Sequence, residues 1–523
     1  MTMPAQFDAA VATAAARIAV QYFDRSITYR ELDDLVSGLA HYLRTRGIVA
    51  GARVAIYLQS SPEFVITTLA AWRAGCVVVP VNPMYRDREI LELLLDSGAS
   101  ALISSEAGYT ACIAGILENT DLRVVLTCDE SAMQRRNDPR VFDRQPSTSS
   151  PAPEDLLTLA RAHYSPQHEF EESAYDDLAL ICYTSGTSGP SKGAMLTHRN
   201  LSTNIESTVQ ILGLARGSRI FAMAPLFHVT GLVVEFLQSI ALAGTLILPY
   251  RFDPAVALDL FLEYRPHFAV GPCTAYSALL ATPGVHREHF RSFEILLAGG
   301  APLPPPLVDA FESLTGHYII NGYGLTETSA ACVLMPIGQR APVDSATSAL
   351  ANGYPFPGVE LRIVDEAGAD LPVGERGEIV IRGPLTSSGY WNKPEETAAA
   401  FRNGWFFTGD IGLFDHNRLL YVVDRKKDMI IASGFKVWPG EVEFVLYTHP
   451  DVREAAVVGI PDEYRGEAVK AYVALVPGAR ATEHELVEWC RDGMAAYKYP
   501  RSIEILTDLP KTASGKILRR ALH

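Results

Sequence analysis

The sequence lacks any arrangement of cysteines typical of disulfide-rich or zinc-binding proteins. No two cysteines form a CxxC pair, and no secretory signal precedes them. This pattern is typical of reduced, buried thiols, so we expect a cytoplasmic protein with neither a disulfide framework nor a zinc site. The seven cysteines are Cys76, Cys112, Cys128, Cys182, Cys273, Cys332 and Cys490.

Runs of positive charge and long apolar runs are also missing. The formal net charge is -15 at pH 7, and no segment rich in lysine and arginine suits a nucleic-acid backbone. The apolar run from Phe236 to Tyr250 is about five residues too short to span a bilayer. We therefore expect neither a nucleic-acid partner nor a transmembrane segment.

What the sequence does contain is a long alternation of apolar runs with segments of helical period. "ARVAIYL" (residues 52–58) and "CVVVPV" (residues 76–81) are typical of buried strands, and the segment between them is typical of a helix. The alternation continues to Gly300 and predicts parallel sheets covered by helices. After Gly353, short strands with alternating polarity predict an antiparallel sheet or a small barrel.

Two stretches resemble joints, and a chain of 523 residues is expected to form more than one domain. Residues 129–177 are rich in proline, serine and charge, and we expect a surface excursion with one short helix. The second joint, "DRKKD" (residues 424–428), separates a strand-rich region from a compact tail. We predict a large domain over residues 1–426 and a small domain over residues 427–523.

The stretch "YTSGTSGPSKG" (Tyr183 to Gly193) predicts a phosphate-binding loop. It follows a predicted strand, and its glycines let backbone N–H groups converge on an anion. A Walker loop would need glycine before the lysine and Ser or Thr after it, whereas Ser191 and Gly193 flank Lys192 here. Taken alone, the segment is also compatible with a solvent loop of small residues.

Four further stretches support the phosphate-loop interpretation. Each is a weak signal by itself, since Asp410 could be a solvated turn residue, Tyr323 a core residue and Lys516 a surface lysine. Their joint occurrence in this order is much more specific. The stretches are "LAGGAPL" (297–303), "NGYGLTET" (321–328), "WFFTGDIG" (405–412) and "PKTASGKILRR" (510–520).

With these motifs the sequence resembles the adenylate-forming superfamily of acyl-CoA synthetases, stand-alone adenylation domains and beetle luciferases. The resemblance runs from about Ile27 to Arg520, and among its members the chain is most similar to bacterial fatty acyl-CoA ligases. Ser188 and Ser191 stand where many members have Thr and Pro, which keeps the side chains small. The resemblance implies an α/β fold: a large domain of two helix-covered parallel-sheet subdomains plus a small β-barrel, followed by a small, mobile α+β domain.

The resemblance also implies a nucleotide site for ATP. Tyr323 would stack on the adenine, Thr326 would touch the α-phosphate, Asp410 would accept the ribose hydroxyls, and Glu327 would hold Mg²⁺, which prefers oxygen ligands. The implied ATP-binding residues are Thr184, Ser185, Gly186, Thr187, Ser188, Gly189, Lys192, Gly299, Gly300, Ala301, Asn321, Gly322, Tyr323, Gly324, Thr326, Asp410, Arg425 and Lys516.

Lys516 is the residue we expect to assist the first chemical step. A carboxylate that attacks the α-phosphate brings two anions together, and a fixed cation between them stabilises the transition state. The implied catalytic set is Lys516, Thr184, Glu327 and His228.

The second step, transfer to coenzyme A, is implied to use other residues of the small domain. Ser433, Gly434 and Lys436 would line the CoA tunnel, so the small domain should swing about a hinge near Lys427. Passage of the acyl group to a carrier protein remains an alternative, as does a catalytically silent scaffold, although the intact Lys516, Glu327 and Asp410 together argue against the latter. A homodimer is left open.

The residues of the implied acyl pocket indicate the class of acid but do not name the acid. "PLFHVTG" (225–231) offers no aspartate for an α-ammonium group, which disfavours amino acids, and Ile431 stands where luciferase-like relatives carry lysine. His228 resembles the aromatic gate of the family, although it could be a packed core histidine. We expect a hydrophobic carboxylic acid, with a fatty acid favoured and an aryl or cinnamate-type acid as the alternative. The implied pocket residues are His228, Val229, Thr230, Gly231 and Ala330.

Overall fold

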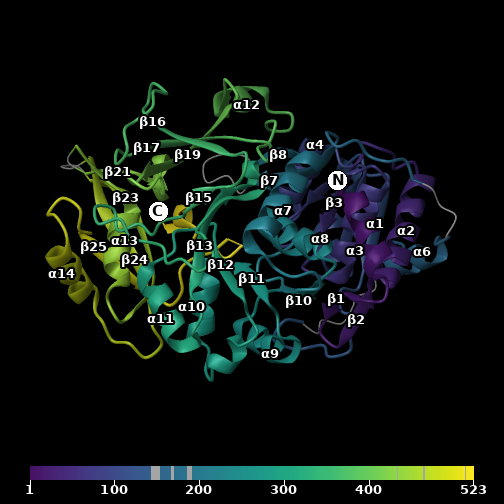
Figure 1. The fold of residues 1–523 in the computed structure, drawn as a ribbon, viewed down its shortest axis with the longest axis horizontal. Coiled ribbons are helices and arrows are strands. Elements are labelled where there is room, and N and C mark those ends of the chain that lie inside the picture. The colour runs from purple at the N-terminus through teal and green to yellow at the C-terminus, as the bar shows by residue number, and fades with distance from the viewer. Residues whose placement is uncertain are drawn as a thin grey trace.

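The computed structural model describes residues 1–142, 153–165, 170–184, 191–432, 434–462, 466–512 and 514–522. Within these residues the strands form four sheets. Figure 1 shows the N-terminal third at one end of the molecule, the central strands β11 to β13 in the middle, and the C-terminal elements at the other end. The mixed α/β class predicted from the sequence is confirmed.

One subdomain is built on a six-stranded sheet, parallel except for its last pair, β7 and β8. Beside it lies α3, whose residues are all buried, because this helix is apolar on most of its circumference. In sheet order the strands are β6 (Val124–Cys128), β5 (Ala101–Ser105), β3 (Arg53–Tyr57), β4 (Val77–Pro80), β7 (Leu178–Thr184) and β8 (Lys192–Thr197).

A second subdomain is built on a nine-stranded sheet with a parallel centre from β13 to β1 and antiparallel strands at both edges. In sheet order the strands are β15 (Tyr354–Pro355), β14 (Ala330–Leu334), β13 (Ile319–Leu325), β12 (Ile295–Ala298), β11 (Phe268–Gly271), β9 (Arg219–Phe221), β10 (Thr245–Leu248), β1 (Ile18–Tyr22) and β2 (Arg25–Thr28). These two sheets match the two parallel-sheet subdomains expected from the sequence.

Local sequence signals set many helix ends in this large domain. Thr197 and Asn200 form a capping box at the start of α7, and Gly213 ends it in the left-handed conformation. The α-helices are α1 (Met3–Ala14), α2 (Tyr29–Thr45), α3 (Pro62–Arg73), α4 (Asp87–Ser97), α5 (Glu106–Gly108), α6 (Leu156–Ala162), α7 (His198–Leu212), α8 (Gln238–Ala241), α9 (Pro254–Tyr264), α10 (Cys273–Ala281), α11 (Pro305–Thr315) and α12 (Pro394–Ala400).

Shorter helical segments of other types complete this domain. Two are π-helices, η1 (Tyr109–Ile113) and η3 (Thr230–Leu237), and the others are the 3₁₀ turns η2 (Leu117–Asn119), η4 (Arg287–Phe290), η5 (Thr326–Thr328) and η6 (Lys426–Asp428). The excursion expected over residues 129–177 contains α6, and its residues 143–152 and 166–169 lie outside the described chain.

A third sheet follows Gly353 and is antiparallel, as the short alternating strands predict. The small barrel is not found among the described residues: β16 stays at one edge, while β18 and β20 pair with opposite ends of the long β19 at the other edge, so the sheet does not close. The strands are β16 (Glu360–Val364), β17 (Gly377–Arg382), β18 (Phe401–Arg402), β19 (Trp405–Phe414) and β20 (Leu420–Arg425).

The C-terminal elements form a fourth sheet with a hydrophobic cluster of its own, drawn from Ile430 to Ile503. In sheet order its strands are β22 (Phe435–Val437), β21 (Ile430–Ala432), β24 (Gly466–Leu475) and β23 (Val452–Asp462), with β25 (Ser502–Leu506) parallel to β24. The helices are α13 (Pro439–Tyr447), α14 (Glu483–Gly493) and the 3₁₀ turn η7 (Arg519–Leu522). In the part of the chain described here, no helix is both long and apolar enough to cross a membrane.

Candidate active site

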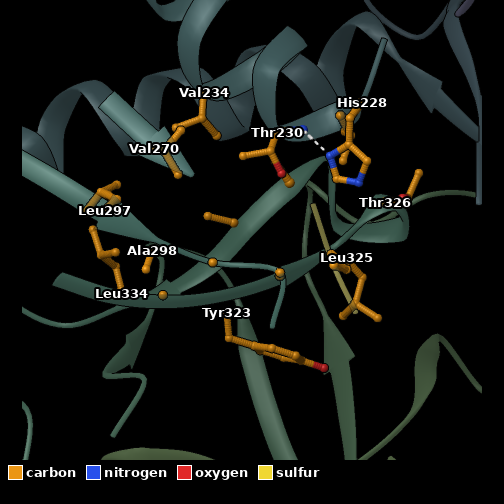
Figure 2. Close-up of a pocket in the computed structure, with 18 residues that line it drawn as sticks. His228, Thr230, Val234, Val270, Leu297, Ala298, Tyr323, Leu325, Thr326 and Leu334 are labelled. Carbon is orange, nitrogen blue, oxygen red and sulfur yellow. Dashed lines mark hydrogen bonds between the residues drawn. The ribbon is translucent and has the colours of Figure 1, made fainter. Parts of the chain in front are cut away.

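A cavity of about 60 Å³ lies at the carboxyl ends of the parallel strands β11, β12 and β13, where ligands bind in open α/β sheets. In Figure 2 its two ends differ in chemistry. One end is apolar and is lined by Val234, Val270, Leu297 and Leu334. The other end carries the polar groups of His228, Thr230, Tyr323 and Thr326, with Leu325 beside them, and Lys516 also lines the cavity.

Glycines let the backbone approach this cavity closely. Gly299 and Gly300 follow β12, and Gly300 has a φ of +82°. A Cβ atom on Gly300 would lie 2.7 Å from Cε of Lys516, so the lysine could not take its present position beside any other residue. Ala330, which also lines the cavity, has a φ of 98°, a strained conformation for alanine.

The buried carboxylate of Asp410 links β19 to the polar end of the cavity. Its Oδ2 accepts a hydrogen bond of 2.7 Å from the hydroxyl of Tyr323, and its Oδ1 lies 3.2 Å from Nε of Arg425. Burial raises the pKa of Asp410, and the charge of Arg425 opposes that rise. The sequence predicts that these three residues bind one nucleotide, and the structure brings them together.

Glu327 is a second buried carboxylate beside the cavity. Its Oε1 accepts a hydrogen bond of 2.7 Å from the hydroxyl of Tyr390, and Nζ of Lys192 lies 5.2 Å from the centre of the Tyr390 ring. Burial raises the pKa of Glu327, against the hydrogen bond from Tyr390. Lys192 is therefore near the carboxylate expected to hold the metal.

A single carboxylate fits Mg²⁺ only if other ligands arrive with the substrate. Among the described residues, no group of three or more His, Cys, Asp and Glu side chains could hold a metal ion. Mg²⁺ in nucleotide sites usually takes one or two carboxylates, the phosphates and several waters. Glu327 fits this role.

Lys516 reaches the cavity from the small domain. Its turn is held against the large domain by Thr274, whose hydroxyl donates a hydrogen bond of 2.6 Å to the carbonyl of Gly515. Desolvation and then the charge of Arg425 lower the pKa of Lys516 to about 8, while Asp410 and Glu327 act in the opposite direction. The negative charges of both carboxylates therefore act on the ammonium group of Lys516.

His228 lies at the polar end, opposite Tyr323 (Figure 2). Its Nδ1 accepts a hydrogen bond of 3.3 Å from the backbone N–H of Thr230. Desolvation, together with the charge of Lys516, lowers the pKa of His228 to about 3. A neutral imidazole therefore faces the cavity at physiological pH.

Of the predicted ATP-site and acyl-pocket residues not yet placed, three line the cavity and four described ones do not. Val229, Gly322 and Gly324 are in the lining with those already named. Gly231 is not, because it packs against backbone: a Cβ atom there would lie 2.3 Å from the carbonyl oxygen of Pro225. Asn321, Ala301 and Thr184 are also outside the lining; Asn321 instead donates to the carbonyls of Leu350 and Ala351.

The remaining predictions fall on other parts of the chain. Gly434 and Lys436 are described, are exposed and do not line the cavity. The predicted phosphate-loop residues Ser185, Gly186, Thr187, Ser188 and Gly189, and the predicted tunnel residue Ser433, lie outside the described residues.

The sequence did not identify two features of the site. Tyr390 belongs to "SSGYWN", which is not part of any of the motifs found in the sequence. Only the fold places it at Glu327. Val270, Leu297 and Val234 line the apolar end. Val270 and Leu297 lie near the ends of two predicted strands, so the convergence of parallel strands was a usable signal for them.

This combination of a doubly wound sheet, a buried carboxylate pair and a lysine from a second domain is that of a nucleotide-dependent, carboxylate-activating enzyme. The chain belongs to the AMP-binding enzyme family, whose model matches residues 7–391, and the model of the AMP-binding enzyme C-terminal domain matches residues 441–516. The predicted membership of the adenylate-forming superfamily is thereby confirmed.

Individual relatives agree with this assignment. A long-chain-fatty-acid–CoA ligase of Bacillus subtilis (strain 168) is 34% identical, over 97% of this chain and 91% of the relative. A feruloyl-CoA synthase of Amycolatopsis sp is 36% identical, over 96% of this chain and 94% of the relative. The solved structure of an anthranilate CoA ligase in complex with anthranoyl-AMP superposes with a TM-score of 0.90 at 26% identity, over 100% of this chain and 96% of that one.

These relatives define the reaction but not the acid. The protein is an AMP-forming acid–thiol ligase that uses ATP and coenzyme A and works through an acyl adenylate. The predicted enzyme class is confirmed. The relatives act on different acids, so the acid has to be argued from the cavity.

Proposed function

We propose that the enzyme activates a hydrophobic carboxylic acid, a fatty acid in the first place. The observation that carries this proposal is the apolar end of the cavity, formed by Val234, Val270, Leu297 and Leu334. Among the described residues, Lys516 is the one charged residue in the lining, and its charge acts on His228 at the polar end. An acid with a second charge would have no partner at the apolar end and would lose its hydration there.

In the first half-reaction a carboxylate oxygen of the acid attacks the α-phosphorus of ATP, and the bond to pyrophosphate breaks. Lys516 supplies positive charge where the two anions meet, and Thr326 supplies a hydroxyl donor. Asp410 orients the ribose, and Tyr323 supplies a face for the adenine. Mg²⁺ at Glu327 would neutralise phosphate charge.

In the second half-reaction the thiol of CoA attacks the acyl carbon, AMP leaves, and a thioester forms. This step requires the small domain, residues 427–523, to turn about a hinge near Lys427. The structure supports the proposal in that Lys516 lies at the cavity while Gly434 and Lys436 are exposed. After the turn, these two residues and Ser433 would line the path of the pantetheine arm.

An aryl or cinnamate-type acid is the second candidate. It is favoured by the 36% identity to a feruloyl-CoA synthase over nearly the whole chain. The apolar end of the cavity would accept a planar ring as well as an alkyl chain. We also place the enzyme in the cytoplasm, because its seven cysteines are all free and buried.

The test separates the two half-reactions. The enzyme is incubated with ATP, Mg²⁺ and each of a series of straight-chain acids, ferulate, benzoate and an amino acid, and release of pyrophosphate is measured. CoA or a phosphopantetheinylated carrier protein is then added, and thioester and AMP are measured. Pyrophosphate with straight-chain acids and thioester with CoA are expected. Activity with ferulate alone, or thioester on the carrier protein alone, would overturn the corresponding part of the proposal.

A further inference from the structure

One buried carboxyl beside the apolar end of the cavity has no role in the reaction described so far. Glu235 lies in the π-helix η3 (Thr230–Leu237) and has no exposed surface. Burial raises its pKa well above the usual range of a carboxyl. A group that is so costly to bury needs a structural or functional reason.

In the described part of the chain, the hydrogen bonds of Glu235 are all with backbone N–H groups. Its Oε1 accepts hydrogen bonds from the N–H groups of Met223, Ala224 and Val270, at 3.0, 3.3 and 3.2 Å. Within the described residues, its Oε2 is buried and has no hydrogen-bond partner. One oxygen atom therefore joins η3 to β11 (Phe268–Gly271) and to the segment that follows β9 (Arg219–Phe221).

The same segments form the apolar end of the cavity. Val234 precedes Glu235 in η3, and Val270 both lines the cavity and donates to Glu235. Figure 2 shows these two valines side by side on the same wall. The carboxyl of Glu235 thus holds the two halves of one wall at a fixed separation.

Two further observations indicate that the position of η3 is restricted by more than the hydrogen bonds of Glu235. Gly231, in its first turn, packs so closely on the chain that a Cβ atom would lie 2.3 Å from the carbonyl oxygen of Pro225. The π-helical geometry itself is rare and occurs mostly at functional sites. The position of the wall is therefore set by a few close backbone contacts, of which Glu235 makes three.

We propose that Glu235 is a positioning residue that sets the width of the apolar end of the cavity and, through it, which acids the enzyme accepts. The inference rests on the proposed function, because it takes the apolar end to be the acyl pocket. Without the carboxyl, three buried N–H groups lose their acceptor and the wall can shift by the fraction of an ångström that distinguishes one acyl group from another.

The experiment compares three variants at Glu235 with one matched control. Glu235→Leu removes the acceptor at similar size, Glu235→Gln keeps a carbonyl oxygen at the same place, and Glu235→Asp keeps the carboxyl but shortens its reach. The control is Gln238→Leu, at a fully buried polar residue one turn further along, whose amide atoms have no hydrogen-bond partner within the described residues. Pyrophosphate release gives kcat and KM for each acid and for ATP.

For Glu235→Leu we expect the preference between a straight-chain and a bulkier acid, expressed as a ratio of kcat/KM values, to change by about tenfold or more. KM for the acid should change, and KM for ATP should not. Glu235→Gln should keep the wild-type preference, and so should Gln238→Leu. A role in folding alone would lower activity with all acids by the same factor and leave the ratio unchanged.

An unchanged acid preference in folded Glu235→Leu overturns the inference, and so does an equal change in Gln238→Leu. If Glu235→Leu does not fold, Glu235→Asp decides, since a changed preference supports the inference and an unchanged one overturns it. Failure of the proposed function is distinguishable, because the wild-type enzyme would then release no pyrophosphate with any hydrophobic acid.

Discussion

At the scale of single residues, Asp410 is a buried carboxylate whose orientation is fixed by its neighbours. Its two oxygens are held by Tyr323 and Arg425, so the carboxylate is oriented before a nucleotide arrives. A carboxylate acceptor of this kind contributes about 1.5–3 kcal/mol per hydrogen bond. The residue is thus suited to determine affinity for ATP.

We predict that Asp410→Ala raises KM for ATP by about tenfold or more, because the ribose hydroxyls lose a charged acceptor pair. KM for the acid should change much less. The measurement is pyrophosphate release at varied ATP, with Asp410→Asn as the variant that keeps one acceptor oxygen. An unchanged KM for ATP in Asp410→Ala would remove Asp410 from the nucleotide site.

Lys516 leads to a pH prediction. Its pKa is lowered from 10.5 to about 8, so its charged fraction falls as the pH rises through 8 instead of through the usual range of lysine. Because adenylation needs the charge, kcat/KM for ATP should fall above about pH 8. Lys516→Arg, which stays charged, should be slower but should not show this alkaline decline. A profile flat to pH 10 in the wild type would contradict the assignment.

At the scale of elements, strands were predictable and η3 was not. "ARVAIYL", "CVVVPV" and the other apolar runs became parallel strands because burial on both faces requires continuous apolar sequence. From Thr230 to Leu237 every residue except Thr230 and Glu235 is apolar or glycine, so the sequence shows no clear helical period. Its geometry depends on partners such as Met223 and Val270, which only the fold brings near.

In the candidate active site, too, contacts between residues far apart in the chain could not be predicted from the sequence. Glycine turns and lone carboxylates such as Asp410 were found from the sequence because a motif carries them. Tyr390 was missed because its contact with Glu327 joins residues far apart in the chain. Gly231 was expected in the pocket from its position in "PLFHVTG", yet its small size serves a close backbone contact.

For Gly231 this contact predicts loss of stability. Gly231→Ala should lower the free energy of unfolding by about 1–3 kcal/mol, because the added methyl group would meet the carbonyl oxygen of Pro225. Urea unfolding measures the change. Gly115→Ala is the control, since a Cβ atom at Gly115 has nothing within 4 Å. Equal stability of the two variants would show that η3 can move away from this contact.

Val234 lines the cavity, whereas Gly231 does not, so Val234 is the position at which the volume of the pocket can be tested. Val234→Phe adds a ring to the apolar end, and a packed wall does not absorb such a volume. We predict that the longest straight-chain acid accepted becomes shorter, while short acids remain substrates. Pyrophosphate release over a series of acids measures this. An unchanged chain-length profile would place the acyl group elsewhere.

At the scale of the whole molecule, charged groups hold the two domains in the present arrangement. Arg376 of the large domain lies 2.8 Å from Glu441, and Asp424 accepts a hydrogen bond of 2.8 Å from the backbone N–H of Gly440. These contacts join β20 and the residue before β17 to the start of α13. They must break if the small domain turns, so the arrangement with Lys516 at the cavity is one defined state.

We predict that the two half-reactions can be separated by substitution. Lys516→Ala should lose adenylation but still convert supplied acyl-AMP and CoA to thioester. Lys427→Pro, which fixes φ at about −65° in η6, should keep adenylation and lose thioester formation. Each half-reaction is measured by itself, with circular dichroism as the folding control. Equal loss of both halves in both folded variants would rule out alternation of the small domain.

The contact between Lys516 and Gly300 has a consequence for energy metabolism. With the lysine in place the cavity has a volume of about 60 Å³, and Gly515 beside the lysine is held by the hydroxyl of Thr274. An acyl adenylate formed there is a reactive anhydride, and a site that excludes water would protect it. When the thiol is scarce, the enzyme would therefore retain a single activated acid and stop, and ATP would not be hydrolysed in a futile cycle.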